Sequence, residues 1–178
     1  MASKQFYVTS DLHASHGQRF LNYLIDFGIQ FILSMGFGFL AYFIGELTNF
    51  YALYDWIQNM NGIEEYLFGG VVLLFYYGLT ETLFSRSLAK FITQTIVVDE
   101  EGLKPTPNQI LKRTLCRFIP FDGLSFLGSN ARGWHDSISD TYVVRKADFD
   151  KAIEIHNSID EIGKPQDELQ NEFSSNNF

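Results

Sequence analysis

Four polar side chains recur at four-residue intervals within an apolar stretch near the start of the chain. They are Asn22, Asp26, Gln30 and Ser34. Residues spaced i, i+4 lie on one face of a helix, so the four form a single polar stripe. In a bilayer this stripe must face protein or water, because an unpaired polar group in hydrocarbon is costly. It therefore predicts either hydrogen-bonded helix packing or a path for an ion or a proton.

Asp26 is the leading candidate in this stripe, because a carboxylate within a membrane span is a functional candidate by default. Arg19 precedes it by two helical turns on the same face, about 10 Å along the helix axis, and could neutralise it. Glu81 is expected at a similar depth in a second apolar segment. Two facing carboxylates would share a proton, which suits proton-coupled exchange. The same residues also suit a purely structural network.

Trp134, His135 and Asp136 follow one another shortly before the last predicted strand. A His beside an Asp could serve acid–base chemistry or bind a metal, but no second cluster with ligand spacing accompanies it. The sequence also contains no nucleophile elbow, phosphate loop or dinucleotide motif. We therefore expect neither enzymatic activity nor a cofactor or metal, and assign Trp134 and His135 to the structure of the loop. Asp136 is expected to hold this loop or to pair with Arg19 or Arg117.

Two apolar segments position these residues. Residues 20–45 contain one charged side chain and would extend about 39 Å as a helix, against a hydrocarbon core of about 30 Å. Residues 66–84 also contain a single charged side chain, and would extend about 28 Å as a helix. A soluble protein of this size rarely hides such long apolar helices, and the polar lead of residues 1–18 without a small-residue cleavage site argues against a signal peptide. The segments predict a transmembrane hairpin.

The distribution of positive charge predicts the orientation of this hairpin. Residues 20–85 contain no Lys or Arg, whereas both recur throughout the chain that follows and also precede the first span. Under the positive-inside rule, both chain ends lie in the cytoplasm and the loop of residues 46–65 lies outside. The lipid bilayer is thus an expected partner.

The segment after the second span contains four further predicted elements. The β-branched residues 92–98 and 141–145 are expected to pair as two short strands. Between them a capping box predicts a helix over residues 107–119. Its three cations argue against a third span, so we expect an amphipathic helix on the inner leaflet with its basic face toward anionic lipid. Residues 147–178 are expected to form a short helix and a disordered tail.

The composition excludes other classes of protein. A net charge of −8 argues against nucleic-acid binding, which needs a basic surface. The single cysteine, Cys116, excludes an intramolecular disulfide and a cysteine-based metal site. Because two spans cannot enclose a pore, a transport role predicts a homo-oligomer or another membrane protein as partner.

The chain resembles the RDD family of small bacterial membrane proteins, named for one arginine and two aspartates. Arg19, Asp26 and Asp136 match these three positions. The order of the later motifs is similar too, including RTLCRFIPF and GWHDSISDTYVV. Where the family tends to have a Gly-Arg-Thr-x-Gly-Lys turn, this chain has Ser85 and Ala89 in place of the glycines.

The resemblance implies a multi-pass protein of the bacterial inner (cytoplasmic) membrane, and some members are linked to cation/proton exchange. The expected fold is mainly α: a two-span hairpin with an interfacial helix and a two-stranded β element, over residues 19–146. One hypothesis is cation/proton transport through an intramembrane polar network. The other is a membrane-embedded interaction or assembly factor in which that network is structural. In both, the candidate residues are Arg19, Asn22, Asp26, Gln30, Glu81, Arg117 and Asp136.

Overall fold

A computed structural model describes residues 5–119, 121–128 and 132–162. The fold is mostly helical, as expected, with one small sheet among the described residues. In chain order the elements are η1 (Ser10–Leu12), α1 (His16–Thr48), α2 (Ala52–Gln58), α3 (Gly62–Phe84), α4 (Leu88–Ile92), β1 (Thr95–Asp99), α5 (Pro107–Cys116), η2 (Asp122–Leu127), α6 (Trp134–Ile138), β2 (Thr141–Arg145) and α7 (Lys146–Ile162).

The helices α1 and α3 are long and apolar enough to cross a membrane, with mean hydropathy of 1.8 and 1.5 in their most apolar windows. Only 6% of that window in α1 and 28% in α3 is buried inside the protein. A core helix of a soluble protein would bury most of its apolar side chains. Most phenylalanines and leucines of both helices are instead exposed, as lipid-facing residues are.

Both long helices extend beyond the apolar segments that predict them, because their ends are set by capping residues. A capping box of Ser15 and Gln18 begins α1, and one of Asn61 and Glu64 begins α3. The apolar run marks the part of each helix that suits hydrocarbon, whereas the polar caps continue the helix beyond it.

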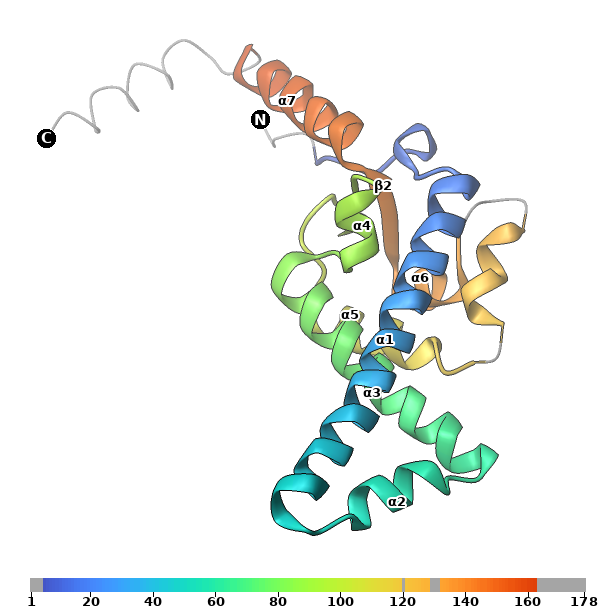
Figure 1. Cartoon of the computed structure of the whole chain (residues 1–178). Helices are drawn as coiled ribbons and strands as arrows, with labels where there is room; N and C mark the ends of the chain where they lie inside the picture. The colour runs from blue at the N-terminus through green and yellow to red at the C-terminus, as the bar shows by residue number, and fades with distance from the viewer. Residues whose placement is uncertain (1–4, 120, 129–131, 163–178) are drawn as a thin grey trace, which may run out of the picture.

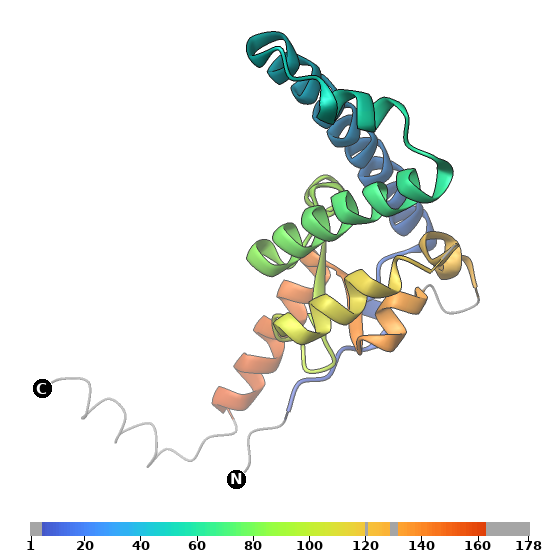
Figure 2. The same cartoon turned by 90° about the horizontal axis from the view of Figure 1, so that it is seen from below.

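The two long helices are inclined to each other, and α2 connects the end of α1 to the start of α3 (Figure 1). The sequence predicts only a loop there. At the other end of the molecule, α7 lies beside the N-terminal segment (Figure 1, Figure 2). Phe6 packs edge-on against Phe149 of α7, and Leu12 and Phe149 share a small core with Val98 and Val144.

The strands β1 and β2 pair antiparallel, with Thr95 opposite Arg145 and Val97 opposite Val143. The first strand begins later than the segment 92–98 suggests, because α4 runs to Ile92 and Gln94 turns the chain with a φ of 55°. The N-terminal lead also contacts this sheet through a bridge from His13 to Val144.

Helix α5 turns its basic face to the protein interior and its apolar face outward, the reverse of the prediction. Arg113 is completely buried, while Leu111 and Leu115 are about half exposed. The prediction that the basic face points to lipid is therefore wrong: Arg113 and Arg117 point into the protein toward buried carboxylates, and only Lys112 is exposed. The buried carboxylates of Glu81 and Asp136 account for this inward orientation. The predicted disordered tail lies mostly outside the described residues.

Candidate functional site

The three carboxylates that the sequence singled out are buried where the helices and the sheet meet. Asp26 of α1 is 2% exposed, Glu81 of α3 is 1% exposed and Asp136 of α6 is fully buried. Burying an ionised carboxylate is costly unless it is paired or hydrogen-bonded, so the donors around each of them define the site.

Asp26 is held by four donors from the corner between α3 and α4. Oδ1 accepts hydrogen bonds from the Tyr76 hydroxyl at 2.5 Å and the Ala89 backbone N–H at 3.2 Å. Oδ2 accepts from the Ser87 hydroxyl at 2.6 Å and the Tyr77 hydroxyl at 3.1 Å. No cation among the described residues forms an ion pair with this carboxylate. Asp26 therefore ties α1 to the end of α3 through neutral donors alone.

The expectation that Arg19 neutralises Asp26 is wrong. Arg19 Nη1 instead lies 2.6 Å from Asp136 Oδ2, more than a hundred residues away in the chain, which confirms the expectation that Asp136 pairs with Arg19 or Arg117. The short helix α6 returns this carboxylate to the first turn of α1, and helical spacing alone cannot reveal such a contact. On the same side of α1, Asn22 accepts a hydrogen bond from Thr93 at 2.5 Å and donates one to Thr95 at 3.1 Å.

Glu81 is paired with three cations. Oε1 lies 2.9 Å from both Lys90 Nζ and Arg117 Nη2, and Oε2 lies 3.0 Å from Arg113 Nε. Burial lowers the pKa of the Lys90 ammonium, an effect that the adjacent Glu81 opposes. No hydrogen bond joins Asp26 to Glu81, and each of these two carboxylates has its own donors.

Arg113 connects the second and third carboxylates. Its Nη1 pairs with Asp136 Oδ1 and donates to the Thr141 hydroxyl at 2.6 Å, while its Nε pairs with Glu81. Burial alone would raise the pKa of Asp136, but Arg113 and Arg19 outweigh it and hold that pKa well below its usual range. One guanidinium thus joins α3, α5, α6 and β2.

The sequence-based candidates omitted Arg113, although it precedes Arg117 by four residues and therefore lies on the same helical face. They also omitted Lys90 and Asp122. We call the full set the polar cluster; its members are Arg19, Asn22, Asp26, Glu81, Lys90, Arg113, Arg117, Asp122, His135 and Asp136. Its four side chains of Lys and Arg balance its four carboxylates when the histidine is neutral.

His135 belongs to this cluster, whereas Trp134 does not. The His135 ring Nδ1 lies 2.6 Å from Asp122 Oδ2, and the His135 backbone N–H donates to Asp122 Oδ1 at 3.0 Å. Trp134 is 48% exposed, and its backbone N–H donates to Ser125. The described residues contain no group of three side chains placed to hold a metal ion. His135 and Asp122 hold α6 against η2.

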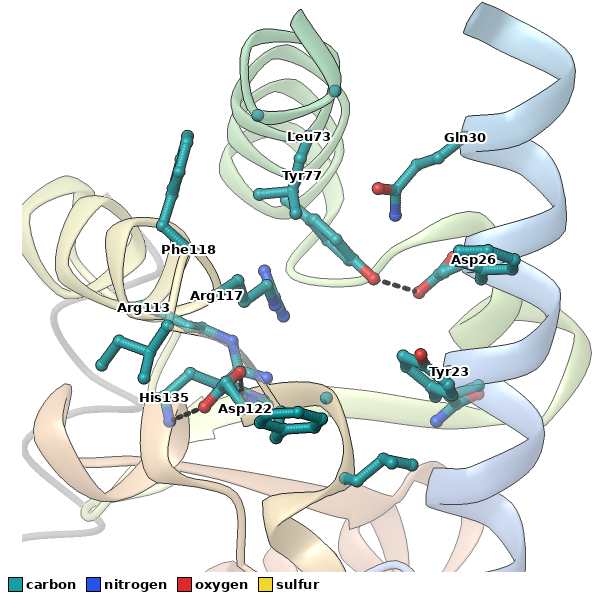
Figure 3. Close-up of a pocket in the computed structure, with 18 of the residues that line it drawn as sticks. Tyr23, Asp26, Gln30, Leu73, Tyr77, Arg113, Arg117, Phe118, Asp122 and His135 are labelled. Carbon is teal, nitrogen blue, oxygen red and sulfur yellow. Dashed lines mark hydrogen bonds and ion pairs between the residues drawn. The ribbon is translucent and has the colours of Figure 1, made fainter. Parts of the chain in front are cut away.

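A cavity of about 540 Å³ adjoins the polar cluster. Asp26, Gln30 and Ser34 line it from α1, opposite Leu73 and Tyr77 of α3. Figure 3 shows Arg113 and Arg117 reaching toward this space from one side, while Gln30 and Asp26 face it from the other. The cavity thus has a charged floor and, above it, a wall formed largely by apolar and aromatic side chains.

The family model of the RDD family matches residues 13–141, which is most of the chain. The chain belongs to the RDD family. Comparison with curated proteins and with solved structures finds no match. The matched region runs from the bridge residue His13 to the first residue of β2, and it contains every member of the polar cluster.

The three residues that correspond to the RDD name do not form one contact. Arg19 and Asp136 make an ion pair, whereas Asp26 anchors a different part of the cluster. In this RDD protein, the two aspartates thus fix the two ends of the cluster: one against α3 and α4, the other against α5 and α6.

The turn after α3 forms although Ser85 and Ala89 stand where the family tends to have glycines. Ser85 ends α3 with a φ of 56°, a left-handed conformation in which glycine has no steric cost. The Ala89 side chain is fully buried and its N–H reaches Asp26. The bonds from Ser87 and Ala89 to Asp26 hold the turn, offsetting the cost at Ser85.

The stability of this RDD protein is expected to decrease as the pH falls below 6.5. Burial lowers the pKa of His135 below its ordinary value of 6.5, although Asp136 and Asp122 oppose this effect. The unfolded chain then binds the proton first, so the contribution of His135 is full above pH 6.5 and is lost as the pH falls toward the folded pKa. Thermal unfolding in detergent at several pH values should show a smaller decrease for His135→Gln. An identical decrease in both proteins would contradict the assignment. Burial also lowers the pKa of His13, which accounts for part of the decrease in stability that remains in His135→Gln.

Proposed function

We propose that this RDD protein is a multi-pass protein of the bacterial inner membrane that acts as a membrane-embedded interaction or assembly factor. Both chain ends lie in the cytoplasm, and the polar cluster is a structural clasp beneath the two spans. The absence of Lys and Arg from residues 20–85 supports this orientation.

The observation that carries the structural role is the saturation of the three carboxylates. Asp26 accepts four hydrogen bonds, and both oxygens of Glu81 and of Asp136 meet cations or backbone N–H groups. A proton carrier needs a free oxygen that can gain and lose a proton. A proton added to Asp26 would displace one of its four donors and loosen the corner between α3 and α4.

Cation/proton transport is the second candidate, and one observation favours it. Asp26, Gln30 and Ser34 line the cavity in succession along α1, and so form a polar edge that leads away from the cluster. Two spans cannot enclose a pore, so this function would require a homo-oligomer or another membrane protein.

The variant Asp26→Asn separates the two candidates. An amide presents N–H groups to two of the four donors, so the structural role predicts lower abundance in the membrane and a lower melting temperature. Cation/proton exchange in everted vesicles, normalised to the amount of protein, should not change. The matched control is Asp55→Asn on the exposed face of α2, which should alter neither quantity. Normal abundance with loss of pH-dependent cation flux would favour transport and overturn the proposal.

A further inference from the structure

The cavity beside the polar cluster has the chemistry of a lipid-binding site. We propose that it binds one phospholipid of the surrounding bilayer, with the phosphate at Arg19 and Arg113 and one acyl chain along the apolar wall. This inference goes beyond the proposed function, which assigns the cluster a structural role and names no ligand.

The floor of the cavity offers guanidinium N–H groups that lack acceptors. Arg113 is fully buried and Arg19 is 6% exposed, and both line the cavity. Among the described residues, Arg113 Nη2 and Arg19 Nε are buried without a hydrogen-bond partner. A buried donor without an acceptor costs about 1–3 kcal/mol, and more when it is charged. Phosphate oxygens match guanidinium groups well, so a phosphate here would satisfy both.

The wall of the cavity is apolar where it leaves the floor. Phe27 and Phe31 of α1 line it and are each 60% exposed, and Leu73 of α3 and Phe118 line it from the opposite side. Because the outer faces of α1 and α3 suit lipid, a chain lying along Phe27 and Phe31 would continue into the hydrocarbon of the bilayer.

The combination of floor and wall selects the ligand. A free phosphate ion would satisfy the arginines but leave the aromatic wall uncovered, and a wholly apolar molecule would leave the guanidinium donors unpaired. The cavity lining contains four side chains of Lys and Arg and three carboxylates, so the single negative charge of one phosphodiester would balance it. A phospholipid has one such group joined to hydrocarbon, and the bilayer supplies it at high concentration.

A substitution at a glycine can fill the cavity without disturbing the polar cluster. Gly69 lines the cavity, and a Cβ atom there would have no heavy atom within 4 Å. Gly69→Leu therefore places a side chain in the space that the acyl chain would occupy. Gly36 of α1 has equally open surroundings but does not line the cavity, so Gly36→Leu is the matched control.

The test is native mass spectrometry of the purified full chain in mild detergent, after delipidation and addition of dioleoyl-phosphatidylglycerol. The wild type and Gly36→Leu should retain one lipid per chain, and Gly69→Leu should bind about tenfold more weakly because its side chain occupies the site. Equal binding by Gly69→Leu, or no bound lipid in the wild type, would overturn the proposal.

Inorganic phosphate and oleate distinguish the sources of the ligand chemistry. Phosphatidylglycerol should raise the melting temperature of the wild type more than either compound does. If inorganic phosphate alone produced the same increase, the site would be one for a free anion; if oleate did, the phosphate assignment would fail. These readouts are independent of the abundance and flux measured for Asp26→Asn, so either proposal can fail without the other.

Discussion

Replacing Arg113 with methionine is expected to lower the free energy of unfolding by about 3–5 kcal/mol, the usual cost of removing one partner from a buried ion pair. Arg113 is completely buried and touches Glu81, Asp136 and Thr141. Methionine has a similar length but no charge, so Asp136 keeps only Arg19 as a close arginine partner. Because four elements meet at this side chain, the loss should affect the whole region beneath the spans.

The measurement is the melting temperature of the purified protein in detergent, together with its abundance in the membrane. Lys112→Met is the matched control, because Lys112 is the exposed neighbour on the same helix and makes no ion pair among the described residues. Arg113→Met should melt far below this control. Similar melting temperatures for the two variants would show that Arg113 does not hold the cluster together.

Neutralising Glu81 is expected to have an effect of the same size. In Glu81→Gln the side chain keeps its shape, but Lys90, Arg113 and Arg117 lose the carboxylate that they share. Three buried cations around a neutral amide repel one another, and we expect a loss of about 3–5 kcal/mol. Moderate salt should restore little of it, because buried charges are poorly screened.

Glu65→Gln provides the comparison for this second variant, since Glu65 is exposed in the first turn of the same helix. Thermal unfolding should separate the two variants clearly. If Glu81→Gln were as stable as Glu65→Gln, the ion pairs of Glu81 would contribute nothing to folding and the structural account of the cluster would fail.

The sequence predicted the features that depend on composition and periodicity. The apolar segments around Asp26 and Glu81 lie within the two long helices, and the resemblance to the RDD family is confirmed. Capping residues at Thr106 and Gln109 correctly predicted the start of α5. These features are local, so a few neighbouring residues determine each of them.

The partners within the polar cluster could not be predicted in the same way. The sequence named Arg19 and Arg117 as possible partners of Asp136, but the choice of Arg19 depends on how the chain after β1 folds back onto α1. The inward orientation of Arg113 depends on the position of Glu81 in a different helix. A basic helix beside a membrane can pair with lipid or with buried acids, and only the tertiary structure decides between them.

We propose that α1 and α3 cross the bilayer with the polar cluster and both chain ends on the cytoplasmic side. Labelling with a membrane-impermeant thiol reagent tests it most directly, using Asp55→Cys in α2 and Asp150→Cys in α7 in a Cys116→Ser background; both aspartates are exposed. Asp55→Cys should react in intact spheroplasts, and Asp150→Cys only in everted vesicles. Reaction of both cysteines from the same side of the membrane would contradict this account.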